Sequence, residues 1–216
     1  MTQPDPTQAR VVSPTGPVLE AAELALRLQA GAVALMPTDT LPALAARPEH
    51  ADQIWALKAR PAHKPLILMA ADLEQLQTVL GCPWRREWLE LADRGWPGAL
   101  TLVLPAKGAW VNWLHPGGRD LGLRIPACHQ ARDLLRLSGP LATTSANPSG
   151  QPAATSAGQA RQLFPDLPML APLPWPEAAG QASTVLAWRD GEGEGPGRWK
   201  LLRAGAFLPA DLQVES

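Results

Sequence analysis

The sequence predicts an α/β protein that folds as one domain, and three observations support this prediction. Short apolar runs of strand length alternate with segments whose apolar residues recur at helical spacing. The 24 prolines and 18 glycines supply the sharp connections that such an alternation requires. A chain of 216 residues is long enough for one well-buried core and does not require two. We expect residues 1–16 to be a loosely held lead-in and residues 17–216 to form the single domain.

Composition and charge exclude several classes of protein. The chain is 46% hydrophobic and 18% charged with a net charge of −1, so its surface as a whole does not attract nucleic acid or membrane. No apolar run approaches the length of a membrane span, and the first ten residues are too polar for a secretory signal. The two cysteines, Cys82 and Cys128, stand in no zinc-ligand motif. We therefore expect a cytoplasmic protein without membrane contact, in which any anion recognition is local.

The first part of the chain predicts a helix, a strand and a polar turn. Val18–Leu28 carries apolar residues at helical spacing, and Gly31 is placed to end that helix. Ala32–Met36 is a short apolar run that suits a buried strand. The strand opens into Pro37-Thr38-Asp39-Thr40, whose hydroxyls could contact a ligand or only satisfy backbone donors of the turn. The residues alone favour the second interpretation.

A cationic segment joins the helix predicted at Glu49–Ala59 to the strand predicted at Leu66–Met69. Its three permanent charges are Lys58, Arg60 and Lys64, which lie between and beside two prolines. The charges could converge on one anion. They could also merely offset the negative end of the helix dipole, which is worth about 0.3–1 kcal/mol per charge. This segment alone does not separate the two interpretations.

The middle of the chain is predicted to be scaffold. Asp72 is placed to cap a helix that ends near Leu80, and Pro83–Arg94 is predicted as a second helix. Leu100–Leu104 is rich in residues that favour strands. Residues 107–120 are expected to be an irregular loop.

An arginine stands inside the next predicted strand, Leu121–Ile125, among apolar neighbours. An unpaired buried charge is strongly unfavourable, so Arg124 should have an anionic partner. A protein carboxylate or the carboxylate of a ligand could serve. From the strand alone, an ion pair within the protein is favoured.

The second informative stretch is the polar loop Thr144–Gly150, which follows a predicted helix at His129–Leu137 and a predicted strand at Leu141–Thr144. Its small hydroxyl and amide side chains let a backbone approach a ligand closely and can bond phosphate or ribose oxygens. An ordinary solvated loop has the same composition, so both interpretations stay open. Thr155 is then expected to cap a helix that ends at Phe164.

The last part of the chain predicts a connection and a hairpin. Pro165–Gly180 is rich in proline and aperiodic, which is typical of a surface connection. Strands are predicted at Gln181–Trp188 and Arg198–Arg203, joined by a glycine-rich tip at Gly191–Gly197. The sequence contains no phosphate loop of the GxxxxGK[ST] or GxGxxG type. A nucleotide would therefore be bound without one.

Seven blocks stand in a specific order along the chain: PTDT, KxRPxxKPL, WPGxLTLVLP, LRIP, TSANPSG, STV and LLRAG. In this order they resemble the YrdC-like family, the bacterial threonylcarbamoyl-AMP synthases, over roughly Ala21–Gly205. The resemblance implies a twisted mixed sheet with flanking helices and a concave, positively charged cavity. It also implies a nucleotidyltransferase that converts L-threonine, bicarbonate and ATP, with Mg²⁺, into threonylcarbamoyl-AMP and pyrophosphate. The product serves the threonylcarbamoyladenosine modification of tRNA.

The resemblance assigns residues position by position. It implies catalytic roles for Lys58 and Arg60, and it names no protein ligand for a metal. The implied ATP contacts are Arg60, Lys64, Ser145, Asn147 and Arg203. The implied threonine contacts are Thr40, Arg124, Thr143 and Ser183, with Arg124 as the carboxylate partner. The expected partners besides the three substrates are a weak contact with tRNA and the downstream threonylcarbamoyl-transfer proteins.

The chain departs from the family pattern beside the expected threonine site. An aromatic residue and a glycine usually follow PTDT, whereas this chain has Leu41-Pro42-Ala43. Met69 and Ala182 also stand where other residues are common in the family. Two alternatives to the synthase therefore stay open. One is a non-catalytic RNA-binding protein of the same fold, and the other is a carbamoyl-adenylate former with a different substrate.

Overall fold

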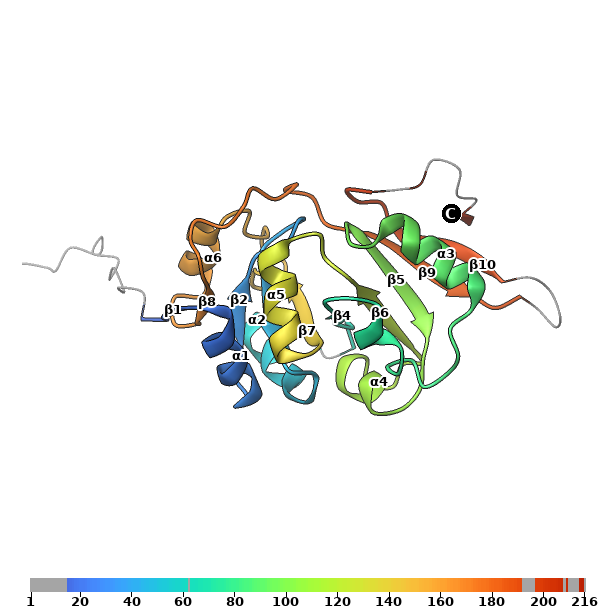
Figure 1. Ribbon diagram of the computed structural model, residues 1–216, viewed down its shortest axis with the longest axis horizontal. Coiled ribbons are helices and arrows are strands. Elements are labelled where there is room, and N and C mark those ends of the chain that lie inside the picture. Colours follow the sequence, from blue (N-terminus) through green and yellow to red (C-terminus); the bar gives the residue numbers. More distant parts are fainter. Residues whose placement is uncertain (1–14, 62, 192–196, 208, 210–213, 216) are drawn as a thin grey trace, which may run out of the picture.

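The computed structural model describes residues 15–61, 63–191, 197–207, 209 and 214–215. All the strands in these residues join one mixed sheet (Figure 1). The strands are β1 (Val18–Leu19), β2 (Ala34–Met36), β3 (Ala43–Ala46), β4 (Ile67–Met69), β5 (Leu100–Pro105), β6 (Asp120–Arg124), β7 (Leu141–Ser145), β8 (Met169–Leu170), β9 (Thr184–Arg189), β10 (Arg198–Arg203) and β11 (Val214–Glu215). Their order across the sheet is β1-β8-β2-β3-β7-β4-β6-β5-β9-β10-β11. Parallel and antiparallel pairs both occur, which confirms the predicted α/β fold with a mixed sheet.

Helices pack on both faces of this sheet. They are α1 (Ala21–Gln29), α2 (Ala51–Lys58), α3 (Arg86–Gly95), α4 (Ala109–Leu114), α5 (His129–Ser138) and α6 (Ala157–Leu163), with short 3₁₀ turns η1 (Pro48–His50) and η2 (Glu74–Leu76). Helices α1 and α5 lie side by side over the part of the sheet that contains β2, β3 and β7 (Figure 1). Buried residues of α2, α3, α4 and α6 belong to a second apolar cluster. The predicted flanking helices are therefore present.

Successive side chains of a strand point to opposite faces of the sheet, so one strand contributes residues to both apolar clusters. In β2, Leu35 belongs to the cluster with α2 and α3, whereas Ala34 and Met36 belong to the cluster with α1 and α5. Each of the three residues is fully buried, because each face of β2 is covered. This double coverage explains why the central strands are apolar runs rather than alternating patterns.

Strand register places the predicted site residues of β6 and β7 on the sheet face that carries α1 and α5. Ala43 pairs with Ser145, and Met69 pairs with Arg124. Paired residues on neighbouring strands point to the same face. Ala43 and Met69 also belong to the cluster of α1 and α5, which identifies that face. Residues far apart in sequence thus meet on one side of the sheet.

Two segments that the sequence assigned to loops contain regular structure. Residues 107–120 include α4, whose Val111 and Leu114 are buried in the larger apolar cluster. The connection Pro165–Gly180 includes β8, which lies between β1 and β2. Both elements are short, and tertiary contacts rather than local pattern determine them.

Other differences concern weak local signals. The helix predicted from Asp72 to Leu80 is only the 3₁₀ turn η2, although Asp72 Oδ1 does accept the Gln75 N–H as a cap. Strand β3 was not predicted, because its sequence ALAA has little strand preference. At α6 the cap is Ser156, whose Oγ accepts the Gln159 N–H, rather than Thr155.

The ends of the chain are described only in part. Of the expected lead-in, only Thr15 and Gly16 lie within the described residues, and they bond Asp166 and Pro165 respectively. The expected hairpin tip lies outside the described residues except for Gly191 and Gly197. No helix in the described part of the chain is both long and apolar enough to cross a membrane.

Candidate active site

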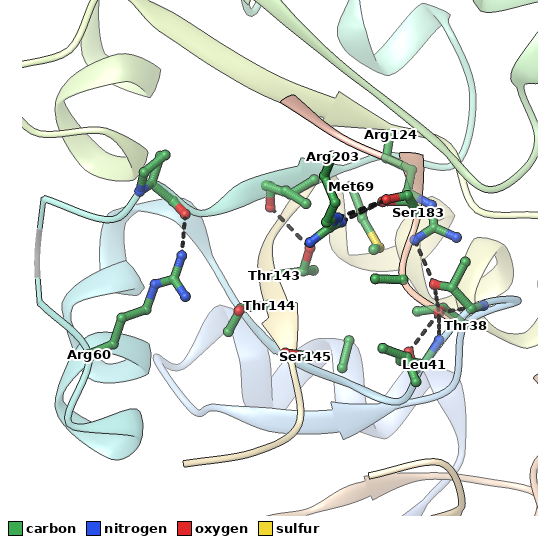
Figure 2. A pocket seen from close by; sticks show the side chains of 15 residues that line it. Thr38, Leu41, Arg60, Met69, Arg124, Thr143, Thr144, Ser145, Ser183 and Arg203 are labelled. Carbon is green, nitrogen blue, oxygen red and sulfur yellow. Dashed lines mark hydrogen bonds between the residues drawn. The ribbon is translucent and has the colours of Figure 1, made fainter. Parts of the chain in front are cut away.

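One cavity collects most of the predicted site residues. Figure 2 shows it from close by with the side chains that line it, and its volume is about 170 Å³. The predicted residues that line it are Thr40, Arg60, Arg124, Thr143, Ser145, Ser183 and Arg203. Lys58, Lys64 and Asn147 do not line it. Pockets for drug-sized ligands usually measure about 300–1,000 Å³, so this cavity can enclose an amino acid, and a larger ligand would extend beyond it.

Arg124, the last residue of β6, is fixed at one end of the cavity by three acceptors. Its Nε donates to Gly98 O at 2.9 Å, its Nη1 to Thr40 Oγ1 at 2.8 Å and its Nη2 to Asp39 Oδ1 at 2.8 Å. The ion pair within the protein, which the strand alone favoured, is therefore present. A guanidinium has five N–H donors, so two remain for the carboxylate of a ligand.

Arg203 lies between Arg124 and Arg60 in the cavity (Figure 2). Its Nε and Nη2 donate to Ser183 O at 3.0 and 2.8 Å, and Nη2 also reaches Ser183 Oγ at 3.2 Å. Ser183 Oγ is in turn 2.8 Å from Thr101 Oγ1, and both hydroxyls are buried. Arg203, expected on the ATP side, thus contacts a residue expected on the threonine side.

Arg60 occupies the opposite end of the cavity (Figure 2). It follows α2, which Ala59 ends in the left-handed conformation with a φ of 48°. Its Nε donates to Lys64 O at 3.3 Å and its Nη2 to Pro65 O at 3.0 Å. The side chain of Lys64 is exposed, so only its backbone contributes to this arrangement. Both acceptors of Arg60 are neutral carbonyls, and its charge is available to an anion.

Lys58, expected to be catalytic, is 2% exposed and bonds only protein oxygens. Its Nζ donates to Ser145 O at 2.6 Å, Asn147 O at 2.5 Å and Asn147 Oδ1 at 3.0 Å. Ser145 Oγ donates to the same Asn147 Oδ1 at 2.6 Å. An ammonium has three donors, and all three are used. In this arrangement Lys58 holds the end of β7 and the residues after it, which include Ser145 and Asn147.

Burial lowers the pKa of four cations in and beside the cavity. Removal from water lowers the pKa of Arg60, Arg124 and Arg203, although the adjacent Asp39 opposes this effect at Arg124. The same cause, followed by repulsion from Arg60, lowers the pKa of Lys58 to about 8. An anion that enters the cavity would relieve this penalty. The electrostatics therefore favour anionic ligands.

A metal site made only of protein ligands is not indicated. The cavity lining in the described residues contains three arginines and no carboxylate. Across the described part of the chain, no three His, Cys, Asp or Glu side chains cluster as a metal would need.

Comparison with known proteins identifies the family. The family model Sua5/YciO/YrdC, described as telomere recombination, matches residues 27–205. The chain belongs to this family. The resemblance that the seven sequence blocks indicated is thereby confirmed.

Two relatives of the Sua5/YciO/YrdC family are informative at the sequence level. The threonylcarbamoyl-AMP synthase of Halorhodospira halophila is 39% identical over 145 residues, which cover 65% of this chain and 75% of that protein. The synthase of the same name from Pseudomonas entomophila is 33% identical over 145 residues and covers 66% of this chain and 78% of that protein.

Solved structures of the family share the fold. P. abyssi Sua5 in complex with L-threonine is 32% identical, with a TM-score of 0.74, over 88% of this chain and 56% of that one. The present chain therefore spans little more than half the length of that protein. E. coli YciO is 20% identical, with a TM-score of 0.72, over 88% and 93% of the two chains, and this likeness concerns the fold alone.

Sequence reasoning missed several residues of this family site. Asp39 was considered only as part of a turn, although a carboxylate next to a buried strand could have been proposed as the partner of Arg124. Thr101 gave no local signal, because its role depends on a contact with Ser183, 82 residues away. The departure at residues 41–43 forms part of the wall, since Leu41 and Ala43 line the cavity.

Proposed function

We propose that this protein is a threonylcarbamoyl-AMP synthase. The nitrogen of L-threonine attacks the carbon of bicarbonate, which gives a carbamate and releases water. A carbamate oxygen then attacks the α-phosphorus of ATP, the bond to the bridging oxygen breaks, and pyrophosphate leaves. The main support for the proposal is the shape and charge of one cavity. At one end Arg124 is paired with Asp39 among threonine and serine hydroxyls, and toward the other end Arg203 and Arg60 have no carboxylate partner among the described residues. The named relatives support the same activity.

The threonine end of the cavity is proposed to consist of Arg124, Thr40, Thr143 and Ser183. The two remaining N–H groups of Arg124 suit a carboxylate, because a guanidinium can bind both carboxylate oxygens. The hydroxyls of Thr40 and Ser183 lie in the same buried wall and can contact the amino acid. Thr143 Oγ1 already donates to Ile67 O at 3.0 Å, so it can serve a ligand as an acceptor.

The ATP end is proposed to consist of Arg60 and Ser145, with Lys64 reaching the phosphates from outside the cavity. Lys58 and Asn147 act through the position of Ser145. Arg203 faces the place where the carbamate meets the α-phosphate. Fixed cations there reduce the repulsion between two anionic reactants and stabilise the departing pyrophosphate. Mg²⁺, when bound on ATP, supplies further neutralisation of phosphate charge.

The broader setting is also a proposal. The product is an activated adenylate, which the downstream threonylcarbamoyl-transfer proteins would consume, with at most a weak tRNA contact by this chain. Residues 17–216 are proposed to act as one domain. The continuous sheet from β1 to β11 supports this.

The decisive experiment measures pyrophosphate release from ATP and bicarbonate, with and without L-threonine. Release that depends on threonine, together with the adenylate detected by mass spectrometry, would support the synthase. Turnover that is indifferent to threonine would reject it in favour of an enzyme that uses another substrate. Absence of turnover combined with tight, salt-dependent tRNA binding would instead support an RNA-binding role.

A further inference from the structure

Asp39 holds two parts of the site together although it does not line the cavity. A single carboxylate oxygen, Oδ1, accepts the Nη2–H of Arg124 at 2.8 Å and the backbone N–H of Ala127 at 3.0 Å. Asp39 lies in the turn after β2, whereas Arg124 ends β6 and Ala127 follows this strand, 85 and 88 residues further along the chain. The carboxylate therefore joins the turn to the strand end.

The direction of the Arg124 guanidinium depends on this contact. Its side chain is 3% exposed, and that of Asp39 is 19% exposed, so water replaces neither group easily. Gly98 O and Thr40 Oγ1 bind the other two engaged nitrogens. Because the guanidinium is planar and rigid, three fixed acceptors determine where its last two N–H groups point.

The same turn also orders the segment that leads to Ser183. Asp39 O accepts the Ala179 N–H at 3.0 Å, and Thr40 O accepts the Gly180 N–H at 3.0 Å. Ser183 follows three residues later and lines the cavity. The turn that contains Asp39 and Thr40 thus contacts both Arg124 and the segment that leads to Ser183.

We infer that Asp39 is a positioning residue for the amino-acid substrate. It aims the two free N–H groups of Arg124 at the substrate carboxylate, and it neutralises Arg124 while the cavity is empty. An unpaired buried guanidinium would be strongly unfavourable, and Asp39 removes this cost without occupying the ligand-facing donors. The inference rests on the proposed function, in which Arg124 binds the carboxylate of threonine.

The test compares Asp39→Ala and Asp39→Asn with the wild-type enzyme. Asp39→Ala removes both hydrogen bonds, and the KM for threonine should rise about tenfold or more, with the KM for ATP changed less than about threefold. Asparagine keeps an oxygen that can accept both N–H groups, so Asp39→Asn should restore the KM for threonine to within about threefold of wild type. Because asparagine carries no charge, the loss of neutralisation should appear as a lower thermal stability and not in this KM. Calorimetric binding of L-threonine should give the same order of affinities.

The matched control is Asp133→Ala, which removes an aspartate whose ion pair with Arg136 is largely exposed. It should leave both KM values unchanged. If Asp39→Ala lowers thermal stability but leaves the KM for threonine unchanged, Asp39 is only structural and the inference is wrong. It is equally wrong if Asp39→Asn is as impaired as Asp39→Ala. A wild-type enzyme without threonine-dependent turnover would instead reject the proposed function before any variant is compared.

Discussion

The two ends of the cavity use arginine in different ways. At the inner end, Arg124 lies on a strand, is almost fully buried, and pairs with the carboxylate of Asp39. At the outer end, Arg60 lies on a connection after α2 and, among the described residues, donates to Lys64 O and Pro65 O, four and five residues away. The inner arginine is thus fixed by long-range contacts and neutralised. Arg60 is held by nearby backbone carbonyls, and no carboxylate of the described residues pairs with its charge.

This difference matches what each proposed substrate requires. A small zwitterion needs a rigid site of defined geometry, because two or three hydrogen bonds must select it. A triphosphate needs positive charge, and its own length allows it to be bound from a more open surface. Lys58, at the end of α2, holds residues 145–147, of which Ser145 lines the cavity.

The largest effect is expected from Arg60→Ala. Loss of a cation that faces the phosphates should lower kcat/KM by about 100- to 1,000-fold, because the stabilisation of the departing pyrophosphate is lost. Circular dichroism and thermal unfolding should show an intact fold, since Arg60 bonds only its own loop. Steady-state pyrophosphate release measures the effect, with the exposed Arg27→Ala as the control. Unchanged turnover would remove Arg60 from the nucleotide end.

Arg124→Ala should act mainly on threonine. We expect the KM for threonine to rise about 30-fold, and the free energy of unfolding to fall by about 1–3 kcal/mol, because Asp39 loses its partner. Initial rates at varied threonine and urea unfolding measure the two quantities. Arg136→Ala, in an exposed ion pair, is the control. A rise in the KM for ATP with no change for threonine would reverse the assignment of the two ends.

Lys58 should give the chain a distinct dependence of stability on pH. Its folded pKa of about 8 lies below its ordinary value of 10.5, so between these values the unfolded chain binds a proton that the folded chain has released. The free energy of unfolding contributed by this group therefore rises with pH. Between pH 8 and 10, wild type should gain on the order of 2 kcal/mol relative to Lys58→Met.

Urea unfolding of both proteins at a series of pH values gives this difference directly, because the other lysines titrate in both and cancel. The absolute stability of Lys58→Met should be lower at neutral pH, since the loop at residues 145–147 loses three hydrogen bonds. Parallel pH curves for the two proteins would show that the folded pKa of Lys58 is not lowered.

The smallest effect is expected from Lys64→Ala. The Lys64 side chain is exposed and does not line the cavity, so it can act on ATP only as a screened surface charge. The KM for ATP should rise about threefold at low salt and less at high salt, with the KM for threonine unchanged. A loss as large as that of Arg60→Ala would mean that Lys64 enters the site when ATP binds.

The local sequence pattern predicted secondary structure correctly where the residues of a segment are enough to determine it. The helix at residues 49–59 and the strands around Leu68, Leu102 and Leu123 follow from apolar spacing and the flanking prolines and glycines. Pattern failed at β3 and β8, because an alanine-rich or two-residue strand is stabilised by its neighbours in the sheet rather than by its own residues. It also failed at α4, where burial of Val111 and Leu114 orders an otherwise weak segment.

The sequence by itself determined most of the charged and polar segments of the site: the cationic segment, the Thr144–Gly150 loop, Arg124 and the family to which their order belongs. The tertiary structure decided how these charges are used. It paired Arg124 with Asp39 and turned Lys58 toward the loop rather than the cavity. The reason is physical. Residue type sets the charge of a side chain locally, whereas burial and partners depend on strand order and register, which bring together residues more than 80 positions apart.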